Sequence, residues 1–230
     1  RACLERLVAC PPGLLVVQTR SPLVADDFAL LRQLGERCWL NFTIETDQDD
    51  VRQQLTPRCP SIAQRLATLE RALASGLNVQ ITVSPCLPYS SVAAFGHLLL
   101  AHGQRVIVDS YVSGDGQGGK RTAATETGRR YSEHGWGDWR SESAARDLFD
   151  WLHERIGARA GWSQAGFRAL TDRLATGASE EAPFFWAGDV ILEVVGPDAG
   201  QKVWPGSTRW PRCGARRAGY PRRKRWPAWT

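Results

Sequence analysis

Three apolar segments of this 230-residue chain, at positions 14–20, 38–47 and 78–88, each end in small polar or charged residues. Helical patterns of roughly ten to fifteen residues separate them, and a fourth apolar segment follows at 105–110. Fully apolar strands that alternate with helices are typical of parallel sheets with right-handed crossovers. The chain is therefore predicted to form an α/β barrel or a doubly wound sheet, with a ligand site where the carboxyl ends of its strands converge.

The predicted helices follow from apolar periodicity and from residues that begin or end a helix. A helix expected over 26–35 closes at Gly35, one over 61–75 closes at Gly76, and one over 90–102 closes at Gly103. A short helix is expected over 47–55, two more over 141–156 and 163–175, and a last strand over 189–195. The compact part of the chain is predicted to end near Val195.

Composition narrows the class of protein. With 43% apolar residues the chain can bury the core of one domain, and it contains no apolar run of about 18 residues that would span a membrane, so a cytoplasmic location is expected. Six scattered cysteines without a regular spacing are expected to be reduced. The chain begins with Arg1 and contains no methionine, so it is interpreted as a piece of a longer protein.

The positive charge is concentrated near the carboxyl terminus. Residues 196–230 hold nine Lys or Arg against one Asp, whereas residues 1–195 hold 20 against 23 Asp or Glu. The segment mixes basic residues, prolines and tryptophans without a helical or strand period, which predicts a disordered basic tail.

Short motifs at three strand ends resemble one enzyme family. They are VQTRS at 17–21, NFTIET at 41–46 and VSPCLP at 83–88, and LTP at 55–57 is followed by Arg65 and Leu66. Over residues 14–122 these motifs resemble the radical S-adenosylmethionine superfamily, in the branch of spore photoproduct lyase and DNA repair photolyase-like proteins. The resemblance implies a partial (β/α)6 barrel over residues 1–122 whose first strands would precede Arg1, followed by a helical extension over 123–195 and the tail.

The resemblance also implies radical chemistry in the intact protein. Enzymes of this family cleave S-adenosylmethionine at a 4Fe-4S cluster to form a 5′-deoxyadenosyl radical, here for lyase-type repair of DNA photoproducts. DNA and a reductant for the cluster are the implied partners. The Cys-x-x-x-Cys-x-x-Cys loop of the family does not occur in the printed sequence, so the ligands of the 4Fe-4S cluster are expected outside this chain, which would be inactive alone.

Four residues are the candidates for binding S-adenosylmethionine. Arg20 and Thr43 match the basic and hydroxyl positions of the family, and Thr19 and Glu45 lie beside them at the strand ends. A guanidinium donates paired hydrogen bonds to a carboxylate, and a hydroxyl binds a ribose hydroxyl or an amine. The alternative is that these polar residues only end strands and solvate the edge of the sheet.

Two further residues have competing interpretations. Cys86, between two prolines at a strand end, is the candidate catalytic residue, as a thiol that donates hydrogen to a product radical; the alternative is a small buried apolar side chain. Asp47 is interpreted as the N-cap of the following helix rather than a ligand contact.

The competing class of function is a non-catalytic α/β module that binds nucleotide or nucleic acid. It would use the glycine-rich loop 114–121, which carries Lys120 and Arg121, together with the basic tail. A Cys-x-x-x-Cys-x-x-Cys motif encoded upstream would favour the enzyme over this alternative.

Overall fold

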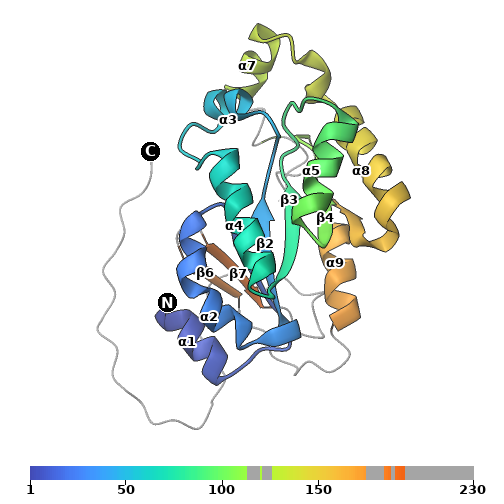
Figure 1. Cartoon of the computed structure of the whole chain (residues 1–230). Coiled ribbons are helices and arrows are strands. Elements are labelled where there is room, and N and C mark those ends of the chain that lie inside the picture. The colour runs from blue at the N-terminus through green and yellow to red at the C-terminus, as the bar shows by residue number, and fades with distance from the viewer. Residues whose placement is uncertain (113–119, 121–125, 175–183, 188–189, 195–230) are drawn as a thin grey trace.

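A computed structural model describes residues 1–112, 120, 126–174, 184–187 and 190–194 (Figure 1). The elements are α1 (Ala2–Ala9), β1 (Leu15–Thr19), η1 (Pro22–Asp27), α2 (Phe28–Arg32), η2 (Gly35–Arg37), β2 (Cys38–Thr43), α3 (Asp49–Leu55), α4 (Ile62–Ala74), β3 (Asn78–Val83), α5 (Val92–His102), β4 (Arg105–Val108), α7 (Thr127–Glu133), η3 (Gly137–Arg140), α8 (Ser143–Ile156), η4 (Gly157–Arg159), β5 (Ala160–Trp162), α9 (Ser163–Leu174), β6 (Phe184–Ala187) and β7 (Val190–Val194).

The strands form one seven-stranded sheet in the order β5-β4-β3-β2-β1-β7-β6. Strands β1 to β5 are parallel and adjacent in chain order, while β7 pairs antiparallel with β1 and β6 antiparallel with β7. The strand order does not reverse anywhere in the parallel part, so the described sheet is not doubly wound. The prediction of a mixed α/β fold with parallel strands is confirmed.

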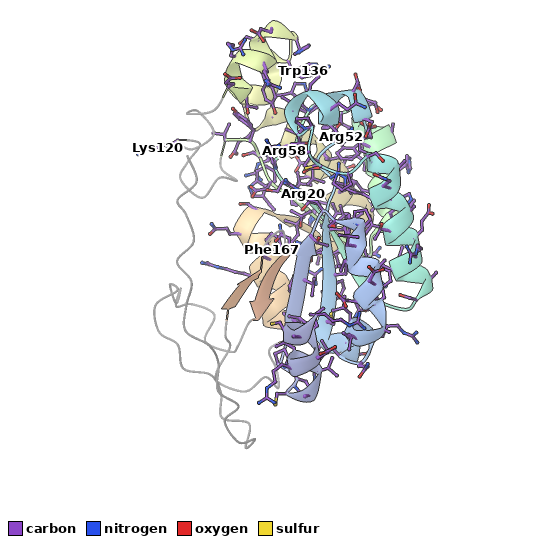
Figure 2. The ribbon with its side chains drawn as sticks, turned by 90° about the vertical axis from the view of Figure 1, so that its left-hand side faces the viewer. Arg20, Arg52, Arg58, Lys120, Trp136 and Phe167 are labelled. Carbon is purple, nitrogen blue, oxygen red and sulfur yellow. The ribbon has the colours of Figure 1, made fainter. Side chains whose placement is uncertain are left out.

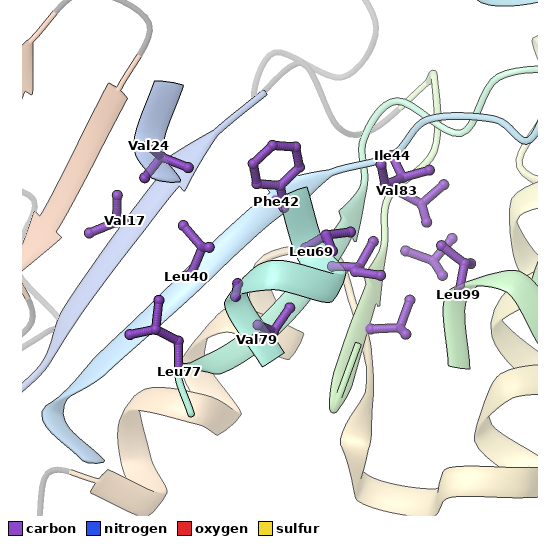
Figure 3. Packing of buried hydrophobic residues seen from close by; sticks show 14 of the residues in the cluster. Val17, Val24, Leu40, Phe42, Ile44, Leu69, Leu77, Val79, Val83 and Leu99 are labelled. Atoms are coloured by element: carbon purple, nitrogen blue, oxygen red, sulfur yellow. The ribbon is translucent and has the colours of Figure 1, made fainter. Parts of the chain in front are cut away.

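One face of the sheet packs against five helices. Alternate residues of the strands point to this face, among them Leu40 and Phe42 of β2 and Val79 of β3, and they form one core with apolar residues of α1, α2, α4, α5 and α8. Figure 3 shows part of this core, including Leu69 of α4 beside the strands. The sequence patterns behind these helices are local: Ser61 and Gln64 form a capping box at the start of α4, and the chain turns after the helix at Gly76, where φ is +81°.

Helix α9 packs on the other face of the sheet. Ile107 lies between Val106 and Val108 of β4, which belong to the helix-covered core, so its side chain points away from that core. A Cβ atom on either Gly161 or Gly166 would lie 3.4 Å from the Ile107 side chain. The sheet therefore has helices on both faces at its β4–β5 end, although the crossover helices between β1 and β4 lie on one face.

The close approach of β5 and α9 depends on two glycines, and alanine at Gly161 is expected to destabilise the protein. Its Cβ would lie 2.6 Å from the Cα atom of Gly166, which is backbone and cannot rotate away. We expect Gly161→Ala to lower the free energy of unfolding by about 1–3 kcal/mol, as overpacking does, in urea denaturation. Gly128→Ala is the control, because no atom lies within 4 Å of the position that its Cβ would take; equal stability of the two variants would contradict the close contact.

Several predictions change with the structure. The segment 123–195 was expected to be a helical extension with one last strand over 189–195. That strand is β7, and the segment also contributes β5 and β6 to the sheet, because short strands leave a weaker sequence pattern than helices. The expectation of reduced cysteines holds for Cys3, Cys38, Cys59 and Cys86 but is wrong for Cys10, which is disulfide-bonded. Among the described helices, none is both long and apolar enough to cross a membrane.

Candidate functional site

The carboxyl ends of the parallel strands are joined to one another by the loop that follows β3. In this loop the Cys86 amide donates to the Asp109 carbonyl at the end of β4 (2.9 Å), and the Leu87 amide donates to the Glu45 carbonyl at the end of β2 (3.0 Å). The Thr46 hydroxyl donates to the Pro88 carbonyl (2.5 Å). These bonds hold three strand ends in fixed relative positions, which a binding site requires.

Glu45 is the centre of the charged group at this edge. Its carboxylate lies between two arginines: Oε2 is 2.6 Å from Nη1 of Arg65, and Oε1 is 2.8 Å from Nε of Arg20. Arg65 comes from the buried side of α4, and neither Glu45 nor Arg65 exposes more than 1% of its side chain. Arg65 Nη1 also donates to the Thr43 carbonyl (2.8 Å). Glu45 is therefore committed to two ion pairs and acts as a positioning residue for Arg20.

Arg20 differs from Arg65 because 40% of its side chain is exposed. Besides the ion pair with Glu45, Nη2 donates to the Ser84 carbonyl (3.2 Å) and Nη1 lies 4.0 Å from the Cys59 sulfur. A guanidinium has five N–H groups, so these three partners leave donors that can face a ligand. Figure 2 shows Arg20 near Arg52 and Arg58 at this end of the strands.

The charge around Arg20 is not balanced. Arg52 forms an ion pair with Asp49 (2.7 Å) and donates to the Cys59 carbonyl (2.8 Å). Hydrogen bonds from Arg52 and from the Ile62 amide hold the pKa of Asp49 far below its usual range. Together Arg20, Arg52 and Arg65 give three positive charges against the two carboxylates of Glu45 and Asp49. An anionic ligand group would compensate the excess positive charge.

The β4 end of the same edge is rich in hydroxyl groups and carboxylates. The pKa of Asp109 is raised, because the effect of burial exceeds that of the hydrogen bonds that lower it. These hydrogen bonds are with the Ser163 and Ser84 side chains and with the Ser110 backbone. The Ser110 hydroxyl donates to Glu142 (3.2 Å). Ser84 therefore connects the two ends: its carbonyl binds Arg20 and its side chain binds Asp109. The edge is basic near β1 and β2, whereas near β4 it carries the carboxylates of Asp109 and Glu142, the second of which pairs with Arg146 (3.8 Å).

The structure brings some of the predicted binding residues together and separates one. Thr43 lies between Phe42 and Ile44, both in the helix-covered core, so its side chain points to the opposite face, and it is 2% exposed. Thr19 alternates with the core residue Val17 and therefore points to the helix-covered face, where its hydroxyl accepts from the Ser21 amide (2.9 Å). Thr19 and Thr43 thus lie on opposite faces of the sheet, and Thr19 shapes the turn after β1.

Cys86 lies in the hydrophobic core, and Asp47 has a partner outside the helix that it was predicted to cap. Cys86 is 2% exposed and belongs to the hydrophobic core, where burial raises the pKa of its thiol. This placement agrees with the interpretation as a small buried apolar side chain. Asp47 is not the cap of α3, whose N-cap is Gln48; its carboxylate instead accepts hydrogen bonds from the amide and hydroxyl of Ser90, just before α5.

Arg65 is the functional candidate that sequence reasoning recognised only as part of a family motif. In α4 it lies between Ile62 and Leu69 at a spacing of three and four residues, and all three are buried. A charged residue within the apolar stripe of a predicted helix indicates a buried ion pair, and this pattern could have identified it.

The described residues contain no group of three or more His, Cys, Asp or Glu that could hold a metal ion. Most of the glycine-rich loop 114–121, with Arg121, and the whole basic tail lie outside the described residues. Lys120 is described and is exposed.

Comparison with known proteins finds a similarity to a viral protein. The chain is 34% identical over 93 residues to ORF301, an uncharacterized protein of Acidianus two-tailed virus. The matched region is 40% of this chain and covers 30% of the viral protein. No protein-family model and no solved structure matches the chain.

Proposed function

We propose that this chain provides the later β/α units of a radical S-adenosylmethionine barrel, in which Arg20 binds the carboxylate of S-adenosylmethionine. The observation that carries the proposal is the half-exposed Arg20 guanidinium, which Glu45 and the Ser84 carbonyl hold at the carboxyl edge of a parallel sheet in sequential order. A guanidinium in fixed position binds a carboxylate in a bidentate manner. Bound S-adenosylmethionine supplies an organic radical precursor, and the residues of this chain orient it.

The described residues fit one part of this cofactor set and not the other. The excess positive charge around Arg20 suits a carboxylate, whereas Thr43, on the face opposite the crossover helices, is only 2% exposed. Cys38 and Cys86 are in the core and offer no ligand set for a 4Fe-4S cluster within the described residues. The proposal therefore assigns the cluster, the reductant and the DNA photoproduct substrate to the longer protein.

Arg20→Ala is expected to weaken binding of S-adenosylmethionine at least about ten-fold, because it removes a charge-assisted hydrogen-bond pair. Equilibrium dialysis with labelled S-adenosylmethionine measures the affinity, and a thermal melt reports the fold. Arg58→Ala is the matched control, since Arg58 is exposed at the same edge, while the ion pairs of Glu45 are with Arg20 and Arg65. Equal affinity of the wild type and Arg20→Ala would remove Arg20 from the site.

The edge of β1 gives a second test of the barrel. In this chain β7 pairs with β1 from Leu15 to Gln18, at the edge where the earlier strands of a barrel would have to add. The proposal therefore predicts that β7 and an upstream strand exclude each other. In a chain extended upstream, hydrogen exchange of the amides of 190–194 is expected to be faster by about ten-fold or more than in the present chain. Unchanged exchange would argue against the barrel.

A further inference from the structure

Four polar residues lie side by side across the parallel sheet. In the strand register Gln18 of β1 is opposite Asn41 of β2, Asn41 is opposite Gln80 of β3, and Gln80 is opposite Arg105 of β4. We call these four residues the polar row. Their sequence neighbours are in the helix-covered core, so the polar row lies on the other face; these neighbours are Val17, Leu40, Val79, Ile81 and Val106.

The hydrogen bonds made by the polar row leave some of its donor and acceptor atoms without a partner among the described residues. The Asn41 carbonyl oxygen accepts from the Thr82 hydroxyl (2.6 Å) and from the Gln80 amide nitrogen (3.3 Å). In this orientation of the two carboxamides both donors meet the same oxygen. The Asn41 Nδ2 and Gln80 Oε1 atoms have no partner within the described part of the chain, although both side chains are fully buried.

A tryptophan beside the polar row also has a polar atom without a partner among the described residues. Trp39, two residues before Asn41 on β2, lies on the same face, and its Nε1 also has no partner among the described residues. The Arg105 guanidinium lies 5.6 Å from the Trp39 ring centroid, so these two side chains approach each other across β3. Gln18 and Trp39 are only half-buried, so the row extends toward solvent at its β1 end.

Unpartnered buried polar groups reduce stability, and their retention indicates a ligand or another role. The unpartnered Asn41 Nδ2 is a donor and the unpartnered Gln80 Oε1 is an acceptor, and the two residues are opposite each other in the strand register. A carboxylate would satisfy Asn41 Nδ2 and oppose the Gln80 oxygen, and an ammonium group would do the reverse. An uncharged ligand whose C=O and N–H lie on one edge satisfies both.

We propose that the polar row binds an uncharged ligand with a cis-amide edge, the edge that lactams carry. Its carbonyl would accept from Asn41 Nδ2 and its N–H would donate to Gln80 Oε1. The proposal concerns a second ligand on the face of the sheet opposite the crossover helices, and it does not rest on the binding of S-adenosylmethionine at Arg20.

The test uses 2-piperidone as the probe and N-methyl-2-piperidone, which lacks the N–H group, as its matched control. Titration of the 230-residue chain is followed by the side-chain amide signals of Asn and Gln in ¹H–¹⁵N NMR spectra. We expect saturable shifts with 2-piperidone and affinity weaker by about ten-fold for the N-methyl compound. No saturable shift with 2-piperidone, or equal affinity for both compounds, would overturn the proposal.

A triple variant separates binding from structure. Asn41→Leu, Gln80→Leu and Thr82→Val together remove the hydrogen-bonded network and leave no donor or acceptor of that network without a partner. We expect the melting temperature to be retained, because no polar group is left unpaired, and 2-piperidone binding to be lost. Retained binding in this variant would refute the proposal. Thr68→Val, on the buried side of α4, is the control and is expected to keep binding.

Should the triple variant fail to fold, Gln80→Met tests the acceptor alone. It is expected to weaken 2-piperidone binding by about ten-fold and to leave the affinity for N-methyl-2-piperidone unchanged. Unchanged affinity of this variant for 2-piperidone would refute the assigned role of Gln80.

Discussion

Glu45→Ala is expected to lower the free energy of unfolding by about 3–5 kcal/mol, the cost of leaving a buried charge without its partner. The Arg65 side chain is fully buried, and Glu45 is its ion-pair partner at 2.6 Å. Removal of the carboxylate leaves this guanidinium with its hydrogen bond to the Thr43 carbonyl, which carries no compensating charge. Urea denaturation followed by circular dichroism measures the change.

The controls for this prediction separate burial from charge. Glu70→Ala removes an exposed carboxylate, 66% of which is accessible, from its contact with His102, and it is expected to change stability by less than about 0.5 kcal/mol. The double variant Glu45→Gln with Arg65→Met removes both charges and is expected to recover most of the loss. A loss below about 1 kcal/mol in Glu45→Ala would show that Glu45 does not compensate Arg65.

Phe42→Ala is expected to have a comparable effect for a different reason. Phe42 is fully buried near the carboxyl end of β2 and lies in the core beneath α4 (Figure 3). Truncation of a buried phenylalanine costs about 3–5 kcal/mol through lost apolar contact and the cavity left behind. The midpoint and slope of urea denaturation measure the loss.

Leu23→Ala is the matched control, since Leu23 is 74% exposed and its truncation is expected to change stability by less than about 0.5 kcal/mol. A Phe42→Ala variant as stable as Leu23→Ala would mean that β2 does not pack as described. Because Phe42 precedes Thr43, this variant also tests whether the core holds the carboxyl end of β2 in place.

Glu45→Ala and Phe42→Ala test two different interactions that hold Arg20 in position. Glu45 holds Arg20 by charge, and the core beneath β2 holds Glu45 by packing. Both variants are expected to weaken anion binding by Arg20, although neither Glu45 nor Phe42 touches the proposed ligand. Arg20→Ala differs from both because it is expected to lose affinity without a large loss of stability.

Much of the fold is readable from the sequence because it depends on local patterns. The apolar runs that form β1 to β4 and the amphipathic helices α4, α5 and α8 are predicted to within a few residues. Caps such as Ser61 and the turn at Gly76 are properties of short segments. The convergence of polar residues at the carboxyl edge also follows from parallel pairing alone.

The partners of each polar residue are not readable from the sequence. Thr19 and Thr43 have similar positions at strand ends, yet the two-residue period of each strand places them on opposite faces. Asp47 binds Ser90 across 43 positions of sequence rather than capping its own helix. Such pairings depend on how strands and loops meet, and no local spacing records them.

The sequence by itself determined the parallel α/β class, the positions of β1 to β4 and the edge at which polar groups gather, because periodicity and helix caps act over a few residues. Only the tertiary structure decided that Glu45 is bound between Arg20 and Arg65, that β7 pairs with β1, and that Gln18, Asn41, Gln80 and Arg105 align across four strands. The physical reason is that ion pairs and strand registers join residues distant in sequence, and their geometry exists only once the sheet has formed.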